Sequence, residues 1–142
     1  MALGELSRGL GLLLARWCLA GIFLYAGYKN IGRVDQTAVQ LAAKAYPAPK
    51  VLAIIAALAA LGGGASLVLG MFTRMGCVAL VLFLLPTTWS FHAQEALRGD
   101  VGQTLQALKN LGLVGGLLAL FGAGPGALSV DHHFFSRRRY EP

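Results

Sequence analysis

The feature that most constrains this 142-residue sequence is a set of four long apolar stretches, at residues 9–28, 51–73, 75–94 and 110–130. The last three contain no Lys, Arg, Asp or Glu. About 20 helical residues, each rising about 1.5 Å, cross a hydrocarbon core of about 30 Å. The pattern therefore predicts an all-α integral membrane four-helix bundle, with residues 1–142 as a single transmembrane domain.

The composition agrees with a membrane protein, because only 13% of the residues are charged, against about 25% in a soluble domain. The 19 glycines suit lipid, where small residues let helix backbones approach closely. We expect no soluble domain, so chemistry outside the membrane would belong to a partner. The first apolar stretch has no convincing cleavage site and is predicted to be a retained helix, not a signal peptide.

The connection between the first two spans predicts a short amphipathic helix at about residues 34–45. Apolar Val34, Ala38 and Leu41 recur there at helical spacing, opposite polar residues. A helix of this kind lies in the interface plane. Pro47 and Pro49 follow and end it, because proline cannot donate to the helix.

The net charge of +6 comes half from the run Arg137–Arg139, in a basic tail predicted at residues 132–142. This run is interpreted as an anchor for anionic headgroups. A nucleic-acid surface is not expected, since a basic soluble face with interleaved aromatics is absent. Four spans put both termini on one side. Arg8, Arg74 and Arg137–Arg139 share that side, and six cations lie on the other: Lys29, Arg33, Lys44, Lys50, Arg98 and Lys109. The density of the tail favours cytoplasmic termini.

Metal chemistry is not predicted. Cys18 and Cys77 both fall within spans and are far apart in sequence. Neither a CxxC motif nor a Cys/His cluster with metal-ligand spacing occurs. Buried apolar side chains are the simplest interpretation of both cysteines, and no covalently bound cofactor is expected.

Arg16 is the charge inside the first span. A charge near the membrane centre costs about 2.5–3.5 kcal/mol on insertion scales, so the side chain should face the bundle interior. Two interpretations remain open at this stage. Arg16 could contact an anion, a quinone carbonyl or a lipid headgroup; alternatively, it could reach the interface or pair with Asp131 or backbone carbonyls.

A second group of candidates lies at span ends on the opposite side from the termini. Lys29, His92 and Lys109, together with Glu95, could rim one polar mouth of the bundle. His92 could then serve as a hydrogen-bond partner or proton carrier, since its ordinary pKa is near 6.5. Ordinary interfacial anchoring of the two lysines is the competing interpretation.

Several local patterns occur in an order that resembles the DoxX family of small bacterial and archaeal membrane proteins. Arg16 precedes Gly27-Tyr28-Lys29-Asn30, similar to the family's first helix. Gly63-Gly64-Ala65-Ser66-Leu67-Val68-Leu69-Gly70 with Thr73-Arg74 is similar to its second helix. Residues 109–131 contain Lys109-Asn110-Leu111, Gly115-Gly116-Leu117-Leu118 and Gly124-Pro125-Gly126-Ala127-Leu128-Ser129-Val130-Asp131, and are similar to its ending. Pro86-Thr87-Thr88 and Phe91-His92 also fit.

These motif residues are interpreted first as structural. Gly63, Gly64 and Gly70 indicate close packing or a kink. Gly124, Pro125 and Gly126 form a helix stop, and Asp131 is expected to cap a turn or to pair with Arg74. In one departure, Ala60 stands where the family often has a glutamate, which weakens the case for autonomous redox catalysis.

The resemblance implies a bundle in the bacterial or archaeal cell membrane and a link to oxidoreduction, because the family takes its name from a subunit of a thiosulfate:quinone oxidoreductase. We expect a non-catalytic accessory subunit that packs against a larger redox-linked complex, respiratory or photosynthetic, or against copies of itself, with lipid around it. The alternatives are a quinone-interacting oxidoreductase subunit using Arg16, Lys29, His92 and Lys109, and a small transporter or lipid-binding protein.

Overall fold

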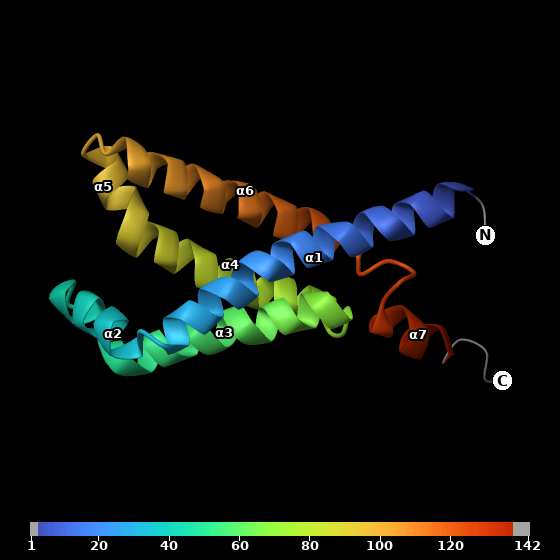
Figure 1. Cartoon of the computed structure of the whole chain (residues 1–142), viewed down its shortest axis with the longest axis horizontal. Coiled ribbons are helices and arrows are strands. Elements are labelled where there is room, and N and C mark those ends of the chain that lie inside the picture. Colours follow the sequence, from blue (N-terminus) through green and yellow to red (C-terminus); the bar gives the residue numbers. More distant parts are fainter. Residues whose placement is uncertain (1–2, 138–142) are drawn as a thin grey trace.

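The computed structural model describes residues 3–137, and that part of the chain is helical apart from short connections. Figure 1 shows the arrangement. The elements in chain order are α1 (Leu3–Ile31), α2 (Val34–Ala43), α3 (Pro49–Leu69), α4 (Thr73–Thr88), a π-helical turn η1 (Trp89–Ala93), α5 (Gln94–Leu97), α6 (Val101–Ala123) and α7 (Val130–Arg137).

Four of the helical segments are long and apolar enough to cross a membrane, as the sequence predicts: 4–31, 49–69, 73–97 and 101–123. The third span runs through α4, η1 and α5 without a break. α3 packs against α1 on one side and α4 on the other, and α6 packs mainly against α4. The termini-side end of the molecule holds both ends of the described chain and the α3–α4 turn, while α2 and α5 mark the loop-side end (Figure 1).

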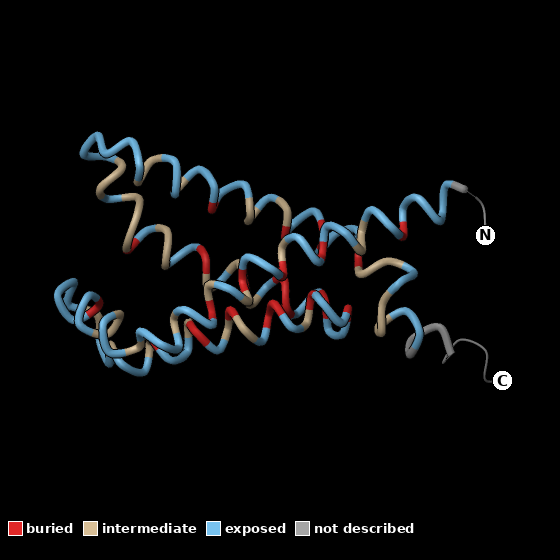
Figure 2. Tube along the Cα trace, in the orientation of Figure 1, coloured by how far each residue is buried: buried red, intermediate tan, exposed pale blue. Residues whose placement is uncertain are grey.

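The bundle core is small and apolar, and its largest buried side chains include Phe23, Leu67, Leu80 and Leu117. Many large apolar residues on the outside are exposed instead, among them Tyr28 at 73%, Met75 at 69% and Leu111 at 65%. Burial is confined to a thin inner seam (Figure 2). An exposed apolar surface all around a helix bundle is what lipid contact requires.

Several element boundaries differ from the sequence-based expectation. α1 runs from Leu3 to Ile31 rather than over 9–28, and α3 ends at Leu69 rather than at 73, because Gly70 follows with φ +66°. The fourth span begins at Val101, not near Asn110, because Asp100 caps its N-terminus by accepting a hydrogen bond from the Gln103 N–H at 2.9 Å. It ends at Ala123, not at residue 130, because Gly124 follows with φ +77°. Part of the tail expected at 132–142 forms α7, which ends at Arg137. Arg138 and Arg139 lie outside the described residues.

The interfacial helix is present as α2, from Val34 to Ala43. Its apolar face turns toward α3, and Leu41 is buried there. The chain then reverses through Ala45 and Ala48, both with positive φ, and Pro49 opens α3. Proline suits this first helical position because its missing N–H would have no helical partner there.

Candidate functional site

Arg16 lies at the depth of the α3 C-terminus. Its Nε donates to the Leu67 carbonyl oxygen at 2.9 Å, and Nη2 donates to that of Val68 at 3.4 Å. Both carbonyls belong to the last turn of α3, a helix of 21 residues and so about 31 Å long, enough to span the hydrocarbon core. Arg16 therefore sits near the termini-side interface, although it is only 1% exposed.

The same guanidinium also holds the chain that follows α6. Nη1 donates to the carbonyl oxygens of Pro125 at 2.6 Å and Leu128 at 3.0 Å. One side chain thus ties α1 to the end of α3 and to residues 124–129. The last carbonyls of a helix have no intrahelical donor and carry the negative end of the helix dipole, so a cation suits this position.

Asp131 makes the complementary contact at the start of α4. Its carboxylate oxygens accept the N–H groups of Phe72 at 2.8 Å and Thr73 at 3.0 Å, and its own N–H donates to the Gly70 carbonyl at 2.9 Å. It therefore caps a helix far away in sequence, where orphan N–H groups favour an anion. Of the roles expected for Asp131, the structure shows capping, and its charge also acts on the Arg16 guanidinium without a direct ion pair.

Gly70 is required where these contacts meet. It has φ +66°, and a Cβ added to it would lie 2.8 Å from Arg16 Cζ and 2.7 Å from Ser129 Cβ. Only glycine offers both that backbone conformation and that space. We call this arrangement the termini-side clasp: Arg16, Gly70, Asp131 and the backbone groups that they bind.

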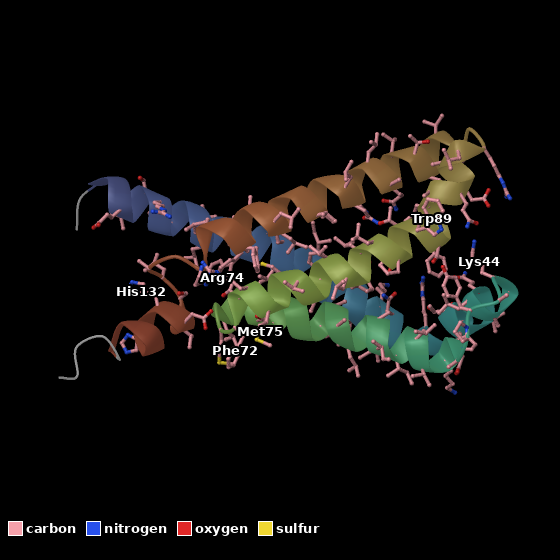
Figure 3. The ribbon with its side chains drawn as sticks, turned by 180° about the vertical axis from the view of Figure 1, so that it is seen from behind. Lys44, Phe72, Arg74, Met75, Trp89 and His132 are labelled. Atoms are coloured by element: carbon pink, nitrogen blue, oxygen red, sulfur yellow. The ribbon has the colours of Figure 1, made fainter. Side chains whose placement is uncertain are left out.

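Arg74 lies beside the clasp and belongs to a different contact. Its guanidinium carbon is 5.9 Å from the centroid of the Phe121 ring, within the range of a cation–π interaction. Within residues 3–137 it forms no ion pair with Asp131. Figure 3 shows Arg74, Phe72 and Met75 gathered at this end of the bundle, with His132 close by.

The loop-side candidates do not form one site through any hydrogen bond or ion pair in the described chain. His92 Nδ1 lies 2.7 Å from Gln103 Oε1, which joins η1 to α6. Lys29 and Lys109 are exposed, and the Lys29 ammonium lies 5.7 Å from the Tyr25 ring centroid. Glu95 pairs with Arg98 at 2.9 Å.

Two further polar contacts at this end were not anticipated from the sequence. Asn110 Nδ2 donates to Thr88 Oγ1 at 2.9 Å, and the Tyr46 hydroxyl lies 2.6 Å from Ser90 Oγ. With the His92–Gln103 pair they form a polar seam that follows the π-helical turn. In the sequence, the features that point to this polar seam are Asn110 at the start of an apolar run and the pair Thr87-Thr88 after Pro86. Cys77 is buried, as the sequence indicated, but Cys18 is exposed, so the interpretation of both cysteines as buried is wrong for Cys18. Within residues 3–137 no three His, Cys, Asp or Glu side chains gather as metal ligands.

Comparison with known proteins decides the family. The DoxX sequence profile matches residues 11–93. The chain belongs to the DoxX family. Its relatives include two Escherichia coli proteins: inner membrane protein YphA, 33% identical over 127 residues (88% of this chain, 91% of the relative), and inner membrane protein YqjF, 32% identical over 121 residues (85% and 89%). No solved structure matches significantly. The profile covers the clasp residues Arg16 and Gly70 of this DoxX-family protein and ends before Asp131.

Proposed function

We propose that this DoxX-family protein is a non-catalytic accessory subunit that packs through α6 against a larger, redox-linked complex in the bacterial cell membrane. The observation that carries the proposal is the uncovered small-residue face of α6. The two E. coli relatives are inner membrane proteins, which supports the location. The redox link rests on the family resemblance.

α6 is the least covered of the four spans. In its most apolar window 17% of the residues are buried, against 28–33% in the other three spans. Figure 2 shows α6 as mostly exposed along its length. Its contacts with α4, and fewer with α1, leave the remaining face open to lipid or to another helix.

The open face carries a stripe of small residues: Gly112, Gly115, Ala119 and Gly122, all exposed. Spacings of three, four and three residues place them on one side of the helix. A Cβ added to any of the three glycines would meet no atom within 4 Å. Such stripes let two helices approach closely in a membrane, where van der Waals packing drives association.

The test is purification of the tagged protein in mild detergent, with identification of proteins that co-purify in fixed stoichiometry. Gly115→Leu should abolish that co-purification by blocking close approach to α6. Gly62→Leu is the matched control, because Gly62 lies in α3 and its added Cβ also meets nothing within 4 Å. If the wild type purifies without a partner, or if Gly115→Leu co-purifies the same partners as the wild type, the proposal is wrong. If the partner has no redox activity, the redox part of the proposal is wrong.

A second candidate is a quinone-interacting oxidoreductase subunit, favoured by the partly buried His92–Gln103 pair. Ionisable groups in a membrane span are functional candidates. If this interpretation holds, His92→Phe should abolish quinone-linked turnover in an assembled complex. His132→Phe, at the opposite end, should leave it unchanged. Full turnover by an intact complex that carries His92→Phe would eliminate this candidate.

A further inference from the structure

A shallow, open depression of about 450 Å³ lies beside the clasp on the termini-side surface. Leu13 and Arg16 of α1 line one side, and Val68 of α3 lines another. The C-terminal segment contributes Leu128, Ser129 and His133, among others. The surface is therefore mostly apolar, with a guanidinium in its wall.

Arg16 forms no ion pair in direct contact within residues 3–137, where the ion pairs are Lys50–Asp35 and Arg98–Glu95; the charge of Asp131 acts on the guanidinium from beyond contact distance. The acceptors of Arg16 are four backbone carbonyls. Asp131 directs both carboxylate oxygens at N–H groups of the α4 start. A nearly buried cation bound only by neutral groups is stabilised further by an anion placed next to it, because the local dielectric constant is low.

Arg16 also keeps donor capacity. A guanidinium has five N–H groups, and four hydrogen bonds use them: one from Nε, two from Nη1 and one from Nη2. The Nη2 bond is the longest, at 3.4 Å. One Nη2 hydrogen is therefore left for an acceptor, and it belongs to a residue that lines the depression.

The depth of the depression indicates where the anion comes from. It is level with the last turn of α3 and so with the boundary between hydrocarbon and headgroups. α1, with 29 residues and about 43 Å long, continues past this level at its N-terminal end (Figure 1). Lipid phosphates lie at that boundary, and the apolar wall formed by Leu13, Val68 and Leu128 suits an acyl chain.

We infer that this depression binds one anionic phospholipid, whose phosphodiester accepts a hydrogen bond from Arg16 and whose acyl chain lies along the apolar wall. The clasp is then completed by a lipid: the guanidinium gains an anion in hydrogen-bond contact, in addition to the more distant charge of Asp131. The inference does not depend on an accessory role and adds a ligand site to the termini-side end.

The test uses native mass spectrometry of the purified full-length chain in detergent, titrated with phosphatidylglycerol or with phosphatidylcholine of the same acyl chains. The wild type should bind one phosphatidylglycerol at least tenfold more tightly than phosphatidylcholine. Val68→Trp fills the depression and leaves the backbone of the clasp in place, so it should weaken phosphatidylglycerol binding at least tenfold. Val78→Trp is the matched control, an equally apolar position in the separate groove between α4 and α6.

Equal affinity for the two lipids, or wild-type phosphatidylglycerol binding by folded Val68→Trp, would overturn the inference. Inorganic phosphate is the third arm. If phosphate alone raises the melting temperature and phosphatidylglycerol does not, the site takes a free anion and the lipid assignment is wrong. Circular dichroism checks that the variants are helical; if Val68→Trp does not fold, Leu13→Trp fills the same depression from α1.

Discussion

At the scale of single residues, Arg16 of α1 donates hydrogen bonds to two other chain segments, the end of α3 and residues 125–128. Arg16→Met keeps an apolar stem and removes every donor, so one buried and three partly buried carbonyl hydrogen bonds are lost. An unsatisfied buried polar group costs about 1–3 kcal/mol, so we expect a loss of at least about 3 kcal/mol. The stability of Arg16→Lys should lie between those of the wild type and Arg16→Met, because an ammonium is a compact donor that cannot reproduce the planar, forked geometry of a guanidinium. Melting temperatures in detergent should follow the order wild type, Lys, Met; equal stability of all three would refute this role.

Asp131 offers a second test at the same scale. Asp131→Asn keeps the shape of the cap but removes its charge and replaces one acceptor oxygen with an NH2 donor, so α4 loses an anion and one capping hydrogen bond at its positive end. We expect a loss of about 1 kcal/mol in the free energy of unfolding. Asp35→Asn is the control: Asp35 pairs with Lys50 at 2.9 Å at the surface, with its side chain 85% exposed, and such pairs contribute about 0–1 kcal/mol. Denaturation in graded detergent should separate the two variants, and an equal response would contradict the capping role.

The sequence predicted the roles of single residues better than it predicted which residues contact one another. The buried charge of Arg16, the capping ability of Asp131 and the constraint at Gly70 all follow from residue type and position. The sequence could not predict that Asp131 caps the N-terminus of α4, because local patterns carry no information on which backbone N–H groups a distant carboxylate will bind. The polar seam shows the same limit, since Asn110 and Thr88 meet only through the packing of α6 on α4.

At the scale of elements, α3 packs against two helices through consecutive glycines: Gly63 faces α4 and Gly64 faces α1. A Cβ on Gly63 would lie 2.5 Å from Leu80 Cγ of α4, and one on Gly64 would lie 2.9 Å from Leu24 Cγ of α1. A Cβ on Gly62 would meet nothing within 4 Å. The close-packing interpretation of this glycine run holds for the last two, and α3 continues as a helix through all three.

Alanine substitution of each glycine therefore has a different expected result. Gly63→Ala and Gly64→Ala overpack helix interfaces, and we expect each to cost about 1–3 kcal/mol. Gly62→Ala should be neutral or should stabilise by up to about 1 kcal/mol, since alanine favours a helix. Thermal unfolding of the three variants in one detergent is the measurement. A Gly62→Ala loss as large as the other two would show that the glycine run matters for another reason.

Element types were predictable and element ends were less so. Apolar length found all four spans, because lipid imposes it on any crossing helix. It placed the start of α6 near Asn110, since residues 101–109 carry polar side chains, although Asp100 already caps the helix there. In the clasp, Arg16 of α1 also binds the backbone of residues 124–129, and a hydropathy pattern cannot predict that tertiary contact.

At the scale of the whole molecule, the structure changes the charge balance that sets membrane orientation. Arg16 lies at the termini-side interface and joins Arg8, Arg74 and Arg137–Arg139, which gives six cations there. Lys109 lies eight residues inside α6, about 12 Å from its start. The loop side then keeps five: Lys29, Arg33, Lys44, Lys50 and Arg98. The excess moves to the side that carries the termini.

We therefore expect both termini in the cytoplasm, because short flanks rich in Lys and Arg are retained there. A green fluorescent protein fused to the C-terminus should fluoresce, and alkaline phosphatase fused there should be inactive. Phosphatase inserted at Gly99, between α5 and α6, should be active. Replacing Arg137–Arg139 with serine leaves three cations against five, so that variant should become mixed or inverted in orientation. An active C-terminal phosphatase on the unaltered chain would reverse the assignment and would place the clasp, with its depression, at the outer leaflet.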